Sequence, residues 1–158
     1  MSFTSLRKHI DSEAQMAAFA SQLAEISRAG DVLLLDGDLG VGKSFFSRCF
    51  INHLAEKQLG KKIEVPSPTF TLVQTYDQLM PAIWHFDLYR LSSPNEAYEL
   101  GLDEAVKTAI CLIEWPSRLE GDLPENCLNI FFEHDGLESR NVKLLLNPEW
   151  AERLKHLF

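Results

Sequence analysis

The amino-terminal part of the chain carries apolar residues at helical spacing. One stripe consists of Met16, Phe19, Ala20, Leu23 and Ile26. Residues spaced by three and four positions fall on one face of an α-helix, so this stripe predicts an amphipathic helix from Ser12 to Arg28. Ser12 and Gln15 form a capping box at its start, and Gly30 is placed to end it.

A continuous apolar run, Val32-Leu33-Leu34-Leu35, follows this helix. Such a run is typical of a central strand that is buried on both faces. A glycine-rich turn comes next, and then a second helical pattern predicts a helix from about Lys43 to Gln58. Its inner face is expected to contain Phe46, Cys49, Phe50 and Leu54.

The second half of the chain is richer in strand patterns. Strands are predicted over Thr69–Tyr76, Ala82–Leu88, Ala109–Ile113, Leu128–Phe132 and Val142–Leu146. Turn residues between the first two and between the last two favour two hairpins. Short helices are expected to begin at Ser93-Pro94 and at Asn147-Pro148, the latter with Trp150, Leu154 and Leu157 facing inward. The pattern predicts one α/β domain over 1–158, with a mixed sheet that has a parallel centre and antiparallel flanking strands.

Composition and charge narrow the class of protein. The 158 residues include 15 Lys and Arg against 23 Asp and Glu, a formal net charge of −8, and 46% are apolar. This is an ordinary globular composition, and a net acidic chain argues against DNA binding and against autonomous tRNA binding. The three cysteines, Cys49, Cys111 and Cys127, are widely spaced, which favours reduced thiols over a zinc site. No apolar stretch has signal-peptide or membrane-span length, so we expect a cytoplasmic protein without membrane association.

A phosphate-binding motif lies between the first predicted strand and the second predicted helix. Residues 37–44, Gly-Asp-Leu-Gly-Val-Gly-Lys-Ser, match G-x-x-x-x-G-K-[ST]. Glycines let backbone N–H groups curl around phosphate oxygens, and the following helix adds its positive dipole end. Lys43 would reach the β- and γ-phosphates, and the Ser44 hydroxyl would ligate Mg²⁺. Because the motif needs this strand–loop–helix context, the sequence predicts nucleotide binding and a three-layer fold like that of P-loop NTPases.

Two carboxylates are candidates for the acidic partner of the Mg²⁺. Glu114 ends the apolar strand Ala109–Ile113, and Asp87 follows the more alternating segment Ile83–Phe86. A carboxylate at the mouth of a buried strand suits a metal site, so Glu114 is the preferred metal partner, directly or through water. Asp87 would then orient water or a neighbouring group, although the sequence also allows the two roles to be exchanged.

Several phosphate-loop classes find no support in this chain. It has no N-K-x-D segment and no D-x-x-G segment after the phosphate loop, which disfavours a Ras-like GTPase, and it has no Gly-Gly pair of the transporter-ATPase kind. Its arginines are scattered rather than gathered in a lid, which argues against a small-metabolite kinase. That kinase and a nucleotide sensor without turnover are kept as alternatives.

Three further segments extend the phosphate-loop motif. They are Ser67-Pro68-Thr69-Phe70-Thr71-Leu72-Val73, His85-Phe86-Asp87-Leu88-Tyr89-Arg90-Leu91 and Ile113-Glu114-Trp115-Pro116. In this order, and together with residues 37–44, they closely resemble the TsaE (formerly YjeE) family of small bacterial ATPases, over about residues 10–135. Ser44 stands where many members of that family carry Thr, and either hydroxyl can ligate Mg²⁺.

The resemblance implies a Mg²⁺-dependent ATPase that is weak alone and that takes part in making threonylcarbamoyladenosine on tRNA. Its implied partners are TsaD, which transfers the threonylcarbamoyl group, and TsaB, and it meets tRNA only through their complex. ATP or ADP contacts carry over to Asp38, Leu39, Gly40, Val41, Gly42, Lys43, Ser44 and Phe45. Active-site roles carry over to Lys43, Asp87 and Glu114, with Ser44 and Glu114 at the metal.

A last group of residues is implied to act as a switch or to face a partner. It consists of Ser67, Thr69, Thr71, His85 and Trp115. From the residues alone, an ordinary turn explains Ser67-Pro68-Thr69 and a structural hydrogen bond explains His85, which by alternation shares a strand face with Asp87. The resemblance instead favours a loop that senses the γ-phosphate. The adenine contacts stay open, with the segment around Asp11 and Ser12 as the candidate.

Overall fold

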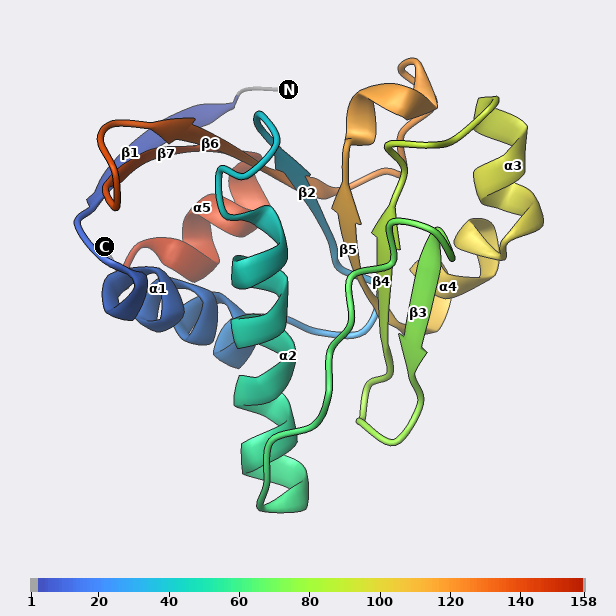
Figure 1. Cartoon of the computed structure of the whole chain (residues 1–158), viewed down its shortest axis with the longest axis horizontal. Coiled ribbons are helices and arrows are strands. Elements are labelled where there is room, and N and C mark those ends of the chain that lie inside the picture. The colour runs from blue at the N-terminus through green and yellow to red at the C-terminus, as the bar shows by residue number, and fades with distance from the viewer. Residues whose placement is uncertain (1–2, 158) are drawn as a thin grey trace.

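The computed structural model describes residues 3–157 and shows one sheet between two layers of helices (Figure 1). The strands are β1 (Thr4–Ile10), β2 (Val32–Asp36), β3 (Val73–Tyr76), β4 (Ile83–Asp87), β5 (Ile110–Glu114), β6 (Cys127–His134) and β7 (Arg140–Leu146). The helices are α1 (Glu13–Ile26), α2 (Lys43–Leu59), α3 (Pro94–Glu99), α4 (Leu102–Thr108) and α5 (Pro148–Leu154), with a 3₁₀ turn, η1 (Pro116–Leu119).

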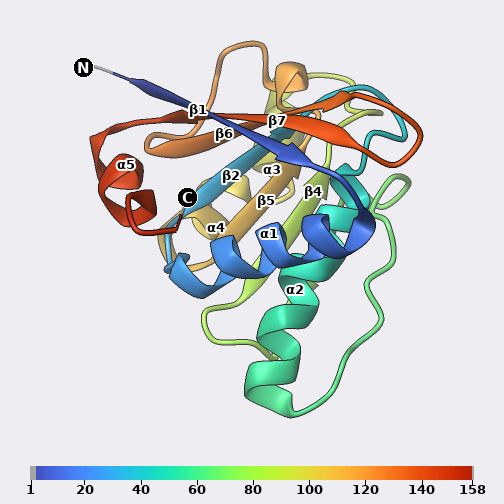
Figure 2. The ribbon, with the colours of Figure 1, turned by 90° about the vertical axis from the view of Figure 1, so that its left-hand side faces the viewer.

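The sheet of the described chain has the strand order β1-β7-β6-β2-β5-β4-β3. β2 pairs in parallel with β5 and β6, and β4 pairs in parallel with β5. β1 and β6 are antiparallel to β7, and β3 is antiparallel to β4; Figure 2 shows β1 at the end of the sheet, beside β7. The predicted mixed sheet with a parallel centre and antiparallel flanks is therefore confirmed.

Each face of the sheet packs against its own set of helices, which confirms the three-layer fold. On one face, α1, α2 and α5 bury large side chains, among them Phe19, Phe46 and Trp150. On the other face, α3, α4 and η1 form a smaller core that includes Leu102 and Leu119. The apolar runs of β2 and β5 lie between these two cores, as expected for strands that are covered on both sides.

The first helix begins as predicted and ends earlier. The Ser12 hydroxyl accepts a hydrogen bond from the Gln15 N–H at 3.2 Å, and the Gln15 side chain accepts one from the Asp11 N–H at 2.7 Å. α1 ends at Ile26 rather than at residue 28, because Ser27 takes an extended backbone and its hydroxyl donates back to the Leu23 carbonyl at 2.7 Å. The predicted stop at Gly30 is therefore wrong; Gly30 lies in the loop before β2.

The predicted strand over 69–76 is half correct. Only Val73–Tyr76 forms strand β3, because the preceding residues turn: the Leu72 N–H donates to the Pro68 carbonyl at 2.6 Å, and Leu72 has a φ of 69°. Three elements escaped prediction altogether: α4, the 3₁₀ turn η1 and the edge strand β1. β1 lacks a strong apolar pattern and is defined by its pairing with β7, from Thr4↔Leu146 to Ile10↔Arg140.

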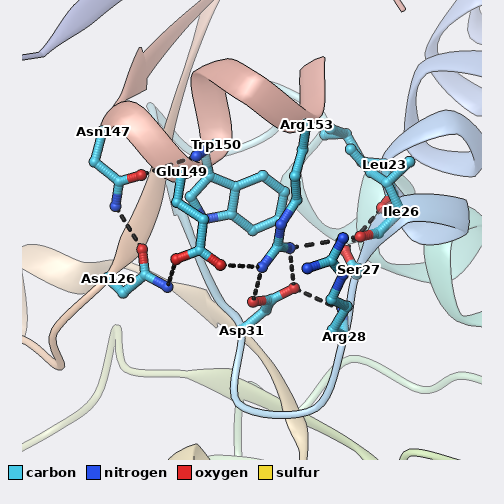
Figure 3. Close-up of polar contacts among 10 residues, drawn as sticks. All are labelled: Leu23, Ile26, Ser27, Arg28, Asp31, Asn126, Asn147, Glu149, Trp150 and Arg153. Atoms are coloured by element: carbon cyan, nitrogen blue, oxygen red, sulfur yellow. Dashed lines mark hydrogen bonds and ion pairs between the residues drawn. The ribbon is translucent and has the colours of Figure 1, made fainter. Parts of the chain in front are cut away.

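A charged network fastens α5 to the loop before β2 (Figure 3). The buried guanidinium of Arg153 contacts both carboxylate oxygens of Asp31, at 2.5 and 3.1 Å, and also donates to Glu149 at 2.7 Å. Asp31 accepts a further bond from the Arg28 N–H at 2.6 Å, and Arg153 lies 4.4 Å from the ring centre of Trp150. The pair thus joins the last helix to the start of the central strand.

Among residues 3–157, every helix is too short or too polar to span a lipid bilayer.

Candidate functional site

The phosphate loop joins the carboxyl end of β2 to the amino end of α2. Gly37 and Gly42 have φ values of 148° and 119°, a region that favours glycine. A Cβ atom on Gly37 would lie 2.6 Å from the carbonyl oxygen of Phe132 in β6. The loop therefore packs against the neighbouring strand so closely that a side chain at position 37 would displace it.

Lys43 points back into this loop from the first turn of α2. Its side chain is buried, and its ammonium donates to the carbonyl oxygen of Gly37 and lies 3.5 Å from the ring centre of Trp115. Burial lowers the pKa of Lys43, while the carboxylates of Glu114 and Asp36 act against that shift. The cation therefore faces the cradle of the loop and is partnered by a carbonyl and an indole.

Ser44 and Glu114 meet at the mouth of the parallel strands. The Ser44 hydroxyl lies 3.2 and 3.4 Å from the two carboxylate oxygens of Glu114, which is only 2% exposed. The same carboxylate lies 2.6 Å from Nε2 of His85, a buried residue of β4. The serine that is expected at the metal thus contacts Glu114, the carboxylate that the strand pattern favours.

Asp87 lies beside Glu114, because the two residues are paired in the register of β4 and β5. Its carboxylate accepts the Tyr89 N–H at 3.0 Å with one oxygen and the Thr69 hydroxyl at 3.0 Å with the other. Thr69 in turn is 2.7 Å from the Ser67 hydroxyl. Asp87 is therefore hydrogen-bonded to the loop 67–72, whereas Glu114 is hydrogen-bonded to Ser44 of α2.

These side chains surround one hollow of about 270 Å³. Its lining residues are Leu39, Gly40, Gly42, Lys43, Ser44, Phe45, Thr69, Asp87, Glu114 and Trp115. A second hollow of about 180 Å³ adjoins it, since both share Gly40, Gly42 and Phe45. The second hollow is otherwise lined by Ile10, Ser12, Glu13, Met16, Val41, Glu138 and Arg140. Phosphate loop, acidic residues and two adjoining cavities thus form one continuous site.

Most of the predicted site residues converge here, and some do not. Asp38, Ser67 and Thr71 are exposed and line neither hollow. His85 is 1% exposed and its Nε2 contacts Glu114, so it makes the structural hydrogen bond that the residues alone favoured and does not face outward toward a partner. Trp115 lies in the site, where its ring contacts Lys43.

The sequence did not single out Arg140, Tyr89 or several residues of the second hollow as site residues. Arg140 reaches from β7 to the phosphate loop, where its Nε donates to the Val41 carbonyl at 2.7 Å. The ring of Tyr89 lies against that of Trp115, with ring centres 4.9 Å apart and the two planes inclined by 51°. The arginine contact spans 99 positions of the chain, and no local pattern signals it. Tyr89 belongs to the motif segment of residues 85–91, which indicated that it lies near the site.

Comparison of the sequence with known proteins identifies the family to which the chain is similar. A protein-family model described as "Threonylcarbamoyl adenosine biosynthesis protein TsaE" matches residues 10–142. A Haemophilus influenzae protein named tRNA threonylcarbamoyladenosine biosynthesis protein TsaE is 36% identical, over 98% of both chains. A protein of the same name from Rickettsia bellii is 41% identical over 77% of this chain and 81% of its own. The match to its namesake from Rickettsia felis, 44% identical over 67% of this chain, spans 60% of that relative's length.

A solved structure agrees with this assignment. The crystal structure of YdiB from Bacillus subtilis superposes with a TM-score of 0.80 at 28% identity, covering 99% of this chain and 96% of that one. Fold, motifs and relatives therefore lead to the same conclusion: the chain belongs to the TsaE family.

Proposed function

We propose that this chain binds ATP with Mg²⁺ and hydrolyses it as an accessory protein of threonylcarbamoyladenosine formation on tRNA, acting on the TsaD–TsaB complex. The observation that carries the proposal is the contact between Ser44 of the phosphate loop and Glu114 at the end of β5, beside the buried Lys43. The names of the TsaE relatives support the link to tRNA modification. tRNA itself is met through the partner proteins, in keeping with the net charge of −8.

The phosphate loop supplies the groups that a nucleoside triphosphate needs. Backbone N–H groups at the start of α2 and the positive end of its dipole attract the phosphates. Lys43 adds a cation that can exchange its partners, because these are a single carbonyl oxygen and the face of an indole. Exchange of the Gly37 carbonyl for phosphate oxygens gives the ammonium a charged partner, which forms a stronger hydrogen bond than a neutral one.

The donors present suit Mg²⁺. The described residues contain no cluster of three or more His, Cys, Asp or Glu side chains arranged around a metal. Mg²⁺ bound with a nucleotide takes one or two protein ligands, waters and phosphate oxygens, and the Ser44 hydroxyl with the Glu114 carboxylate matches that set. When bound, the metal would neutralise charge on the β- and γ-phosphates.

We assign to Asp87 the task of orienting the attacking water. Its carboxylate borders the same hollow as Lys43, and both of its oxygens are held, by the Tyr89 N–H and the Thr69 hydroxyl. Thr69 also connects Asp87 to the Ser67 hydroxyl. A contact between this loop and a γ-phosphate would therefore shift the hydrogen bond that holds the Asp87 carboxylate. In this assignment Thr69 is the switch contact, and Trp115 at the rim faces the partner.

The second hollow suits the nucleoside. Its lining includes the apolar residues Ile10, Met16 and Phe45 and the polar residues Ser12 and Arg140. Bases are held by apolar surfaces with a few polar contacts. Ser12 belongs to the segment that the sequence offered as the candidate for the base and lines this hollow, whereas Asp11 does not.

The test is phosphate release from ATP with and without purified TsaD–TsaB. We expect strong stimulation by the pair, and its loss in Lys43→Ala and Glu114→Ala. Lys57→Ala is the matched control, because Lys57 is an exposed lysine at the other end of α2. ATP binding without turnover in the presence of the partners would indicate a sensor instead. Transfer of phosphate to a small metabolite would indicate a kinase.

A further inference from the structure

His85 is a buried imidazole next to the site that does not line either hollow. Its side chain is 1% exposed, and its Nε2 lies 2.6 Å from the Glu114 carboxylate. Its Nδ1 is buried and has no hydrogen-bond partner among residues 3–157. Among the described residues, the imidazole of His85 is therefore held by its hydrogen bond to Glu114.

The sheet register explains why the two residues meet. β4 and β5 are parallel neighbours in which His85 is paired with Leu112 and Asp87 with Glu114. Alternation places His85, Asp87 and Glu114 on the face that α2 covers. His85 therefore lies two residues before the carboxyl end of β4 and reaches diagonally to Glu114 at the end of β5.

The bond controls how Glu114 presents its carboxylate. His85 holds oxygen Oε2 at 2.6 Å, while Ser44 lies 3.2 Å from Oε1 and 3.4 Å from Oε2. A hydrogen bond to a carboxylate requires a proton on Nε2, so the ring acts as donor and the carboxylate as acceptor. His85 thus holds Oε2 from one side of the carboxylate, while the Ser44 hydroxyl lies against both oxygens and nearer to Oε1.

We propose that His85 is a positioning residue that holds the Glu114 carboxylate in the orientation required for Mg²⁺. The inference rests on the proposed function, since it presumes a metal between Ser44 and Glu114. Outer partners of metal-binding side chains fix ligand orientation in this way, and their loss typically weakens metal affinity roughly 10- to 100-fold. His85 would act through Glu114 and would not touch the nucleotide.

Two amide substitutions separate this role from simple packing. The amide nitrogen of His85→Gln can reach the place of Nε2, whereas that of His85→Asn is too short to reach Glu114. We expect the Asn variant to need about 10-fold or more Mg²⁺ for half-maximal binding of a fluorescent ATP analogue, and the Gln variant to stay within about threefold of the unsubstituted chain. Analogue binding without Mg²⁺ should be alike in all three proteins.

The chain offers a matched control for the loss of a histidine–carboxylate bond. Nε2 of His53 lies 2.7 Å from Glu25 on the surface between α1 and α2. His53→Asn removes a bond of the same kind away from the site, and the Mg²⁺ requirement should not change. Circular dichroism and melting curves of each variant establish that it is folded.

A crystal structure of His85→Asn without nucleotide tests the inference independently of any binding assay. We expect the Glu114 carboxylate to leave Ser44. An unmoved carboxylate, or an unchanged Mg²⁺ requirement in the Asn variant, would overturn the positioning role alone. A folded Gln variant whose Mg²⁺ requirement rises about 10-fold or more would also overturn it, whether or not the Asn variant folds. Absence of any Mg²⁺ effect in the unsubstituted chain would overturn both this role and the proposed metal site.

Discussion

At the scale of single residues, Lys43 is the most consequential side chain. A buried ammonium is costly unless it is hydrogen-bonded or paired, and here it is bound by one carbonyl oxygen and lies over an indole face. A cation 3.5 Å from a ring centre is a favourable cation–π contact. Lys43 and Trp115 therefore form a pair that a bound phosphate would separate.

This pair predicts a fluorescence signal for nucleotide binding. ATP should draw Lys43 away from the Trp115 ring and change the indole emission, because the charge next to the ring moves. Titration of the chain with ATP and Mg²⁺ at the tryptophan emission band measures the change. Trp115→Phe should abolish the signal, although Trp84 and Trp150 still emit, and Lys43→Ala should abolish it together with binding. A signal that persists in Trp115→Phe would place its source elsewhere.

The cysteines give a second prediction at this scale. Burial raises the pKa of the Cys111 and Cys127 thiols to about 12, and also raises that of Cys49. A thiol reacts as its thiolate, and at pH 8 a thiol with a pKa near 12 has roughly one part in ten thousand in that form. We expect Cys111 and Cys127 to resist a maleimide at pH 8 and to react at once in denaturant. Mass spectrometry of the labelled chain locates the label; rapid native labelling of Cys111 would contradict its burial.

At the scale of elements, prediction succeeded where the local pattern was unambiguous. The central strands β2 and β5 are almost unbroken apolar runs, α2 repeats apolar positions at helical spacing, and the glycine motif located Lys43 and Ser44 because its spacing is local. β1 was missed because its partner lies more than a hundred positions away. The residues before β3 favour a strand by composition, but the turn through Leu72 prevails.

The same reasoning explains what was predictable in the site. The end of an apolar strand marked Glu114 as an acidic site residue. Its contacts with Ser44 and His85, and the reach of Arg140 to Val41, depend on sheet order. The order of strands in the sheet cannot be read from any local segment of the sequence, so these contacts are seen only in the folded structure.

The anchor of α5 gives a prediction at the element scale. The side chains of Arg153 and Asp31 are 7% and 4% exposed, and removal of one partner of a buried pair leaves an uncompensated charge at a cost of about 3–5 kcal/mol. Arg153→Met should therefore lower the free energy of unfolding by about that amount. Urea denaturation measures it.

A double substitution and a surface control test the explanation. Asp31→Asn combined with Arg153→Met should destabilise the chain by less than the sum of the single changes, because no buried charge is left unpaired. Lys155→Ala breaks an exposed pair with Glu152 and should change stability by at most about 1 kcal/mol. Additive single effects would show that Asp31 and Arg153 act separately.

At the scale of the whole molecule, the site lies where the fold directs ligands. The carboxyl ends of the parallel strands β2, β4 and β5 meet at one edge of the sheet, and ligands of open α/β sheets bind outside such ends. Phosphate loop, Glu114, Asp87 and loop 67–72 come from four separate parts of the chain. A nucleotide bound there would contact all four of them.

Binding at such a junction should raise the stability of the entire domain. A ligand at 100 times its dissociation constant adds about 2.7 kcal/mol to the native state, which for a chain of this size corresponds to a rise in Tm of roughly 5–10 °C. Differential scanning fluorimetry with ATP and Mg²⁺ measures the rise. Lys43→Ala should show none, Glu114→Ala should lose the part that depends on Mg²⁺, and Lys57→Ala should match the unsubstituted chain. An equal rise in Lys43→Ala would contradict the role of Lys43 in nucleotide binding, because the phosphates would then be held without its ammonium.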